Sequence, residues 1–152
     1  MSGDGTILLV EDNQDDEALT LRAFNRNKIR NPIVCVRDGQ EALDWLFGEG
    51  AHAGRNVAER PAVVLLDLKL PKVDDLEVLR RVRANPATRL TPIVILTSSR
   101  EDRDRLEGYS LGANSYIQKP DEFDRYPDLL RLLRAYWQHT ALRPARPRPP
   151  GP

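Results

Sequence analysis

Two kinds of segment alternate along the chain. Short apolar runs rich in Val, Ile and Leu are separated by longer stretches in which apolar residues recur at three- and four-residue steps. Such runs predict strands, and the longer periodicity predicts amphipathic helices. The predicted strands are Thr6–Val10, Pro32–Val36, Ala62–Leu66, Pro92–Leu96 and Ser115–Gln118. The predicted helices are Asp15–Asn27, Gly39–Phe47, Leu76–Ala84, Arg100–Leu111 and one from about Glu122 to His139.

This order predicts a doubly wound α/β domain. The strand runs are apolar on both faces, which is typical of a parallel sheet covered by helices on each side. With 152 residues and no internal repeat, the chain is expected to form one domain over residues 5–140. The segment from Gly48 to Pro61 is predicted to be a mobile surface loop. Residues 141–152, rich in Pro and Arg, are predicted to be a disordered tail.

Charge and hydropathy narrow the possible locations and partners. Lys plus Arg and Asp plus Glu number 23 each, so no overall field favours nucleic acid or an anionic membrane. The apolar runs are far shorter than the roughly 20 residues of a membrane span, and the polar start Met1–Asp4 has no signal region. A cytoplasmic chain is expected. Its one cysteine, Cys35, lies in an apolar run and is predicted to be a buried thiol.

Polar residues follow four of the five predicted strands. They are Glu11 and Asp12 after the first, Asp67 after the third, Thr97 and Ser98 after the fourth, and Lys119 after the fifth. In an open parallel sheet, reactive groups gather at the carboxyl ends of the strands. Three carboxylates, a hydroxyl and an ammonium are therefore predicted to meet at one edge.

Each of these residues alone has an ordinary explanation, because Asp and Ser cap helices and Lys is common on surfaces. Together they indicate chemistry. Three neighbouring carboxylates repel one another unless a cation lies among them, and an oxygen-only set suits Mg²⁺. An aspartate beside Mg²⁺ and a lysine is a plausible nucleophile toward a phosphoryl group, and Thr97 could donate a hydrogen bond to a phosphoryl oxygen.

Four segments in order resemble the CheY-like receiver domains of response regulators. They are Ile7–Asn13, Leu65–Pro71, Ile95–Ser98 and Tyr116–Pro120, and the resemblance extends over about residues 5–140. It implies a flavodoxin-like (βα)5 fold whose five-stranded parallel sheet has the strand order 2-1-3-4-5. It also implies a two-component signalling protein that assists only its own phosphorylation and dephosphorylation.

The resemblance assigns a role to each residue of the predicted site. Asp67 would take the phosphoryl group from a sensor histidine kinase, and Lys119 would pair with the phosphoryl oxygens. Thr97 would swing toward them and draw Tyr116 inward, and the Lys119–Pro120 bond would be cis. The implied Mg²⁺ ligands are Glu11, Asp12, Asp67 and the backbone carbonyl of Lys69.

One position departs from the family pattern. The family usually has glycine eight residues after the phosphorylated aspartate, where this chain has Asp75. If the glycine serves for backbone freedom, the turn must change or Asp75 must adopt a less comfortable conformation. The long loop before the third strand, the stretch Tyr109–Tyr116 and the pair Tyr136–Trp137 look like the small regulators paired with bacterial phytochromes.

The output is expected to be protein–protein contact through the receiver's own surface. Fewer than fifteen residues follow the last predicted helix, too few for a DNA-binding domain. That helix carries one apolar stripe for the core and a second formed by Leu129, Leu132 and Tyr136. The second stripe either widens the core-facing surface or forms a homodimer through the fourth helix, fifth strand and fifth helix.

Two alternative functions would use the same residues. A phosphohydrolase of the haloacid dehalogenase type also has an Asp nucleophile and Mg²⁺, but its motif needs a second aspartate where this chain has Lys69. A degenerate receiver that is never phosphorylated is expected to have lost an acid or the lysine, and only Asp75 hints at that.

Overall fold

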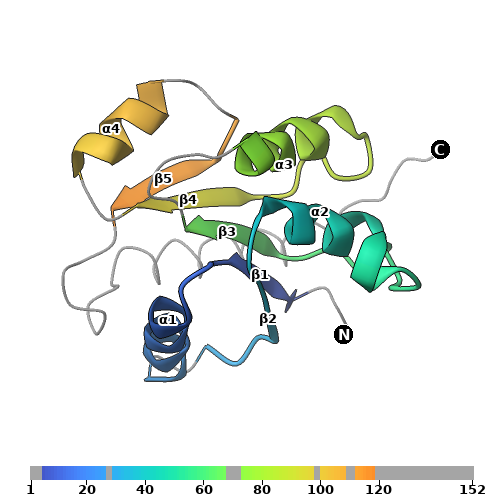
Figure 1. The fold of residues 1–152 in the computed structure, drawn as a ribbon, viewed down its shortest axis with the longest axis horizontal. Coiled ribbons are helices and arrows are strands. Elements are labelled where there is room, and N and C mark those ends of the chain that lie inside the picture. The colour runs from blue at the N-terminus through green and yellow to red at the C-terminus, as the bar shows by residue number, and fades with distance from the viewer. Residues whose placement is uncertain (1–4, 27–28, 68–72, 98–99, 109–111, 119–152) are drawn as a thin grey trace.

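A five-stranded parallel sheet forms the centre of the molecule. The computed structural model describes residues 5–26, 29–67, 73–97, 100–108 and 112–118 (Figure 1). The strands are β1 (Ile7–Val10), β2 (Ile33–Val36), β3 (Val63–Asp67), β4 (Ile93–Thr97) and β5 (Ser115–Gln118). Their order is β2-β1-β3-β4-β5, and every neighbouring pair is parallel. The predicted strand order and fold class are confirmed.

Helices cover both faces of this sheet. They are α1 (Gln14–Arg26), α2 (Gly39–Phe47), α3 (Val73–Ala84) and α4 (Arg100–Gly108), with a short 3-10 helix, η2, at Gly50–His52. Figure 1 shows α1 on one side of the sheet and α2 and α3 on the other. The last predicted helix, Glu122 to His139, lies outside the described residues.

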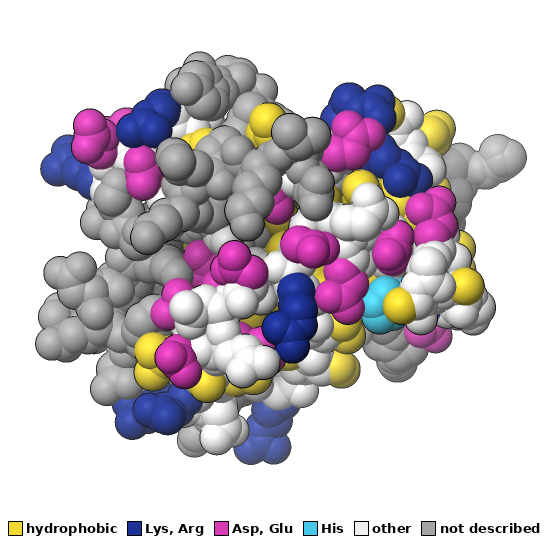
Figure 2. Space-filling view, viewed as in Figure 1, with side chains coloured by type: hydrophobic (Ala, Val, Ile, Leu, Met, Phe, Trp, Pro, Cys, Tyr) yellow, Lys and Arg dark blue, Asp and Glu magenta, His cyan; other side chains and the backbone are white. Residues whose placement is uncertain are grey.

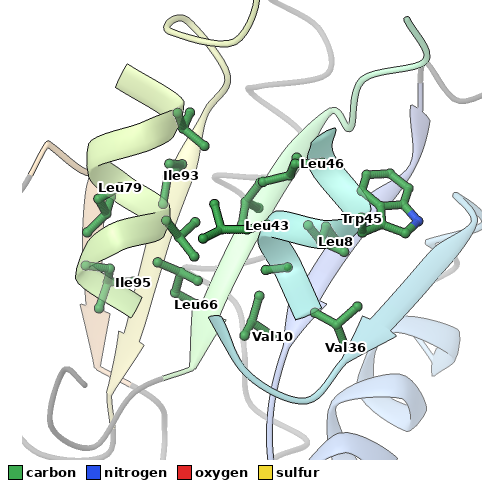
Figure 3. Close-up of a cluster of buried hydrophobic side chains, with 14 of the residues drawn as sticks. Leu8, Val10, Val36, Leu43, Trp45, Leu46, Leu66, Leu79, Ile93 and Ile95 are labelled. Atoms are coloured by element: carbon green, nitrogen blue, oxygen red, sulfur yellow. The ribbon is translucent and has the colours of Figure 1, made fainter. Parts of the chain in front are cut away.

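Alternate residues of β1, β2, β3 and β4 enter two separate apolar clusters. Leu8 and Val10 of β1 pack with α2 and α3, whereas Ile7 and Leu9 pack with Phe24 of α1. Figure 3 shows the first cluster, in which α2 and α3 side chains meet those of the central strands. Because successive strand residues point to opposite faces, a strand must be apolar throughout to fill both clusters. This explains the unbroken apolar runs of the sequence.

The segment expected to be a mobile loop has a defined fold in the structure. Helix α2 ends at Phe47 and is capped by Gly48, whose φ of 66° is the left-handed conformation that favours glycine. The guanidinium of Arg55 then lies 3.7 Å over the Trp45 ring and donates hydrogen bonds to the carbonyls of Trp45, at 2.6 Å, and Glu59, at 3.0 Å. One arginine therefore fastens the loop to α2.

Candidate functional site

Strand register places two of the predicted acids at the same level of the sheet. Val10 of β1 pairs with Leu66 of β3, so Glu11 and Asp67, the next residues, follow at the same end. Asp67 in turn pairs with Leu96 of β4, and Thr97 comes one residue later. The structure thus places Glu11, Asp67 and Thr97 along adjacent carboxyl ends, as predicted.

The turn after β1 is fixed by its own hydrogen bonds. Glu11 is only 5% exposed, and its backbone N–H donates to the Val36 carbonyl at 2.9 Å. Its Oε2 accepts a hydrogen bond from the Asn13 N–H at 3.1 Å. Asn13 also caps α1, because its Oδ1 accepts from the Asp16 N–H at 2.9 Å. Asn13 was missed as a contributor to the site, since its role depends on turn geometry and gives no signal in apolar periodicity.

The other two acids are more accessible than Glu11. Asp12 is exposed and Asp67, the last residue of β3, is half-buried. Within the described ranges, no three His, Cys, Asp or Glu side chains are arranged to hold a metal ion. Carboxylate oxygens are nevertheless the donors that Mg²⁺ prefers, so the residues present fit this ion chemically. The expected carbonyl ligand, Lys69, lies outside the described residues, and the ligand set remains a prediction.

Thr97 and Tyr116 lie on the same face of the sheet. Ile95 pairs with Tyr116 across β4 and β5, and both contribute to the cluster under α2 and α3. Thr97, two residues after Ile95, returns to that face. It is fully buried, and among the described residues its Oγ1 has no hydrogen-bond partner. This arrangement suits a hydroxyl that is used only when a ligand arrives.

Asp75 has a helical backbone. It is the third residue of α3, which begins at Val73 and not at the predicted Leu76. It is 5% exposed. An acid in the first turn of a helix is stabilised by the helix dipole, so this position does not require the conformational freedom of glycine. The departure from the family pattern is accommodated by the start of α3.

Several predicted features lie outside the described residues. They are Lys69, Ser98, Lys119 with its bond to Pro120, and the stripe Leu129, Leu132 and Tyr136. In the part of the chain that the structure covers, no helix has the length and apolar character needed to cross a membrane.

Comparison with known proteins identifies the family. The family model of the response regulator receiver domain matches residues 7–131 of the chain. The chain belongs to the response regulator receiver domain family. It is 42% identical to the probable methanogenesis regulatory protein FilR2 of Methanothrix harundinacea, over 86% of this chain and 82% of that protein.

Solved receiver structures agree with this assignment. The bacteriophytochrome response regulator RtBRR is 42% identical, with a TM-score of 0.75 over 93% of this chain and 92% of its own. The Mn²⁺-bound form of the response regulator Rcp1 is 30% identical, with a TM-score of 0.64 over 97% and 99% of the two chains. This receiver is therefore a two-component signalling domain similar to bacteriophytochrome response regulators.

Proposed function

We propose that the receiver accepts a phosphoryl group on Asp67 from a sensor histidine kinase. The observation that carries the proposal is the strand register, in which Asp67 of β3 lies between Glu11, the residue after β1, and Thr97 of β4. An Asp67 carboxylate oxygen would attack the phosphorus of a phosphohistidine. A new P–O bond would form as the P–N bond breaks, and the imidazole would leave with the bonding electrons.

The chain's own residues would divide the work of this transfer. Asp12, Asp67, Glu11 and the Lys69 carbonyl would hold a divalent cation, and the Mn²⁺-bound form of Rcp1 supports such a site. Mg²⁺ would neutralise charge on the phosphoryl oxygens. Lys119 would pair with another of these oxygens. The Thr97 hydroxyl would donate to a third, which would draw Tyr116 inward.

The proposal extends to the partner kinase and to the way the receiver signals. The likeness to RtBRR supports a bacteriophytochrome-type histidine kinase as the phosphoryl donor. A cytoplasmic receiver over residues 5–140, with a disordered tail at 141–152, would signal through its own surface without binding DNA or membrane. We propose a homodimer through α4, β5 and the following helix, because β5 is the edge strand of the sheet on that side.

Intact-protein mass measures the phosphorylation directly. The protein is incubated with acetyl phosphate, with and without Mg²⁺, beside Asp67→Asn and Asp104→Asn, the second of which changes an exposed acid of α4. We expect one phosphoryl group to be added to the wild type and to Asp104→Asn, only with Mg²⁺, and none to Asp67→Asn. Absence of any addition from acetyl phosphate or a kinase would instead identify an unphosphorylated binding module.

Molecular mass in solution tests the dimer. Leu132→Glu places a charge on the second stripe of the last predicted helix, and Leu90→Glu is the matched control, because Leu90 is already 76% exposed. We expect the wild type and Leu90→Glu to sediment as dimers and Leu132→Glu as a monomer. Monomers for all three proteins, phosphorylated or not, would rule out the interface.

A further inference from the structure

Arg83 joins three segments that are far apart in the sequence. It lies in the last turn of α3. Its Nη1 donates to the carbonyls of Arg89, at 3.0 Å, and Thr91, at 2.7 Å, in the connection that enters β4. Its Nε donates to the Gly112 carbonyl at 2.8 Å, just before β5. One guanidinium therefore holds the entries to both strands.

The next hydrogen bond continues this link into the sheet. Arg83 Nη2 donates to Asn114 Oδ1 at 2.9 Å, and the same oxygen accepts the Ile93 N–H at 2.8 Å. The Asn114 N–H donates to the Ile93 carbonyl at 2.7 Å. Asn114 thus pairs with the first residue of β4, and Arg83 fixes the side chain that completes the pair.

Gly112 has the backbone conformation that this link requires. Its φ of 96° lies in the region that side chains rarely adopt, and its carbonyl faces the guanidinium. The turn before β5 is therefore held by backbone geometry and by a charged donor together. Charge-assisted hydrogen bonds of this kind are stronger than neutral ones.

The helix that precedes this turn is attached much less firmly. Leu106 is the only buried residue among the described side chains of α4, residues 100–106, and all the others are charged. Figure 2 shows acidic and basic side chains together over α4, at the upper left of the view. Two ion pairs of this helix, Arg103–Asp104 and Arg105–Asp102, join residues of α4 to each other. An element with so little buried surface shifts at low cost.

We propose that Arg83 is a positioning residue that fixes the entry to β5, so that α4 can move while β5 and Tyr116 keep their register with β4. The anchor lies at the amino ends of β4 and β5, opposite the edge that carries Asp67. Movement of α4 would then leave residues 112–114 in place, and any accompanying change in β5 would be confined to its carboxyl half. The part of this inference that concerns phosphorylation rests on the proposed function, whereas the anchor itself does not.

Hydrogen–deuterium exchange of the unphosphorylated protein tests the anchor. Arg83→Lys keeps the charge and most of the aliphatic side chain, but the lysine ammonium cannot make the four hydrogen bonds of the guanidinium. Arg80→Lys is the matched control, because exposed Arg80 pairs with Glu77 on the same helix. We expect Arg83→Lys to raise exchange at residues 112–118 about tenfold, as the loss of charge-assisted hydrogen bonds implies, with β1 and β3 unchanged. Exchange equal to that of Arg80→Lys, or raised equally in every strand, would overturn the proposal.

A second comparison asks whether the anchor separates α4 from β5. After acetyl phosphate and Mg²⁺, the wild type should change its exchange in α4 while residues 112–114 stay unchanged, and in Arg83→Lys the change should spread into 112–114. Equal changes in α4 and in residues 112–114 of the wild type would refute the separation. If the wild type takes up no phosphoryl group, the proposed function fails, and the unphosphorylated comparison still decides the role of Arg83.

Discussion

Asp67 of β3, the proposed phosphoacceptor, pairs with Leu96 of β4 in parallel register, so Thr97 is the next residue along β4. Thr97 is also the end of a strand whose preceding residues are fully buried. Burying this hydroxyl lowers the stability of the fold, because the group loses its hydrogen bonds to water and gains none in return. The position suits a group whose partner is a transferred phosphoryl oxygen.

Substitution of Thr97 should separate stability from response. Thr97→Val removes the buried hydroxyl and should leave the free energy of unfolding unchanged or raise it by about 1 kcal/mol. Thr97→Ser keeps the hydroxyl and should lose about 1 kcal/mol through the missing methyl group. Urea denaturation measures both, and exchange at Tyr116 after acetyl phosphate should change in Thr97→Ser but not in Thr97→Val. A clear loss of stability in Thr97→Val would show that the hydroxyl already has a partner.

The strands could be predicted from the sequence because their chemistry is uniform. The apolar runs of β1 to β4 each fill two cores at once, and the structure places every predicted strand within one residue of its expected ends. The start of α3 could not be predicted in the same way. Asp74 and Asp75 interrupt apolar periodicity, yet acids are favoured in the first turn of a helix, so α3 begins three residues early.

The site was predicted to the extent that it depends on strand ends. Glu11, Asp67 and Thr97 follow from the rule that parallel strands present their carboxyl ends together. The contacts that hold the surroundings in place were not predicted. Arg83 and Arg55 look like ordinary solvated arginines in the sequence, and most of their acceptors are backbone carbonyls of distant segments, which no residue type marks.

Arg55 should account for much of the order in the loop before β3. Arg55→Ala removes the contact with the Trp45 ring and two hydrogen bonds, so we expect the free energy of unfolding to fall by about 1–2 kcal/mol. Limited proteolysis should also cut residues 49–61 faster. Arg60→Ala, at an exposed position in the same loop, is the control. Equal cleavage of the two variants would mean that other contacts hold the loop.

Leu106 should act as the main apolar attachment of α4. Leu106→Ala is expected to lower the free energy of unfolding by about 2–4 kcal/mol. The leucine is only 1% exposed, so its truncation leaves a cavity under the helix. Hydrogen exchange should rise most in residues 100–108. Leu90→Ala, which truncates an exposed leucine, should change neither quantity. Exchange that rises evenly along the whole chain would indicate that α4 unfolds only with the rest of the domain.

Cys35 of β2, which was predicted to be buried, is half-buried in the structure, and we expect its thiol to be unreactive in the folded protein. Burial raises its pKa from the ordinary 9.0 to about 12, and a hydrogen bond to the Glu17 carboxylate and the charge of Glu17 add to the shift. Because the folded state keeps the proton that the unfolded state loses, this group stabilises the fold fully below pH 9 and progressively less as the pH rises toward 12. Iodoacetamide should therefore modify the native protein far more slowly than the urea-unfolded protein.

Substitution of Glu17 identifies the source of this shift. Glu17→Gln removes the charge but leaves the burial, so the pKa of Cys35 should fall part of the way toward 9.0 and alkylation of the native protein at pH 9 should become faster. Asp15→Asn, an exposed acid of the same helix, should leave the rate unchanged. If neither substitution changes the rate, burial alone suppresses the thiolate. If both do so equally, the general negative charge of α1 is responsible, and Glu17 makes no specific contact with the sulfur.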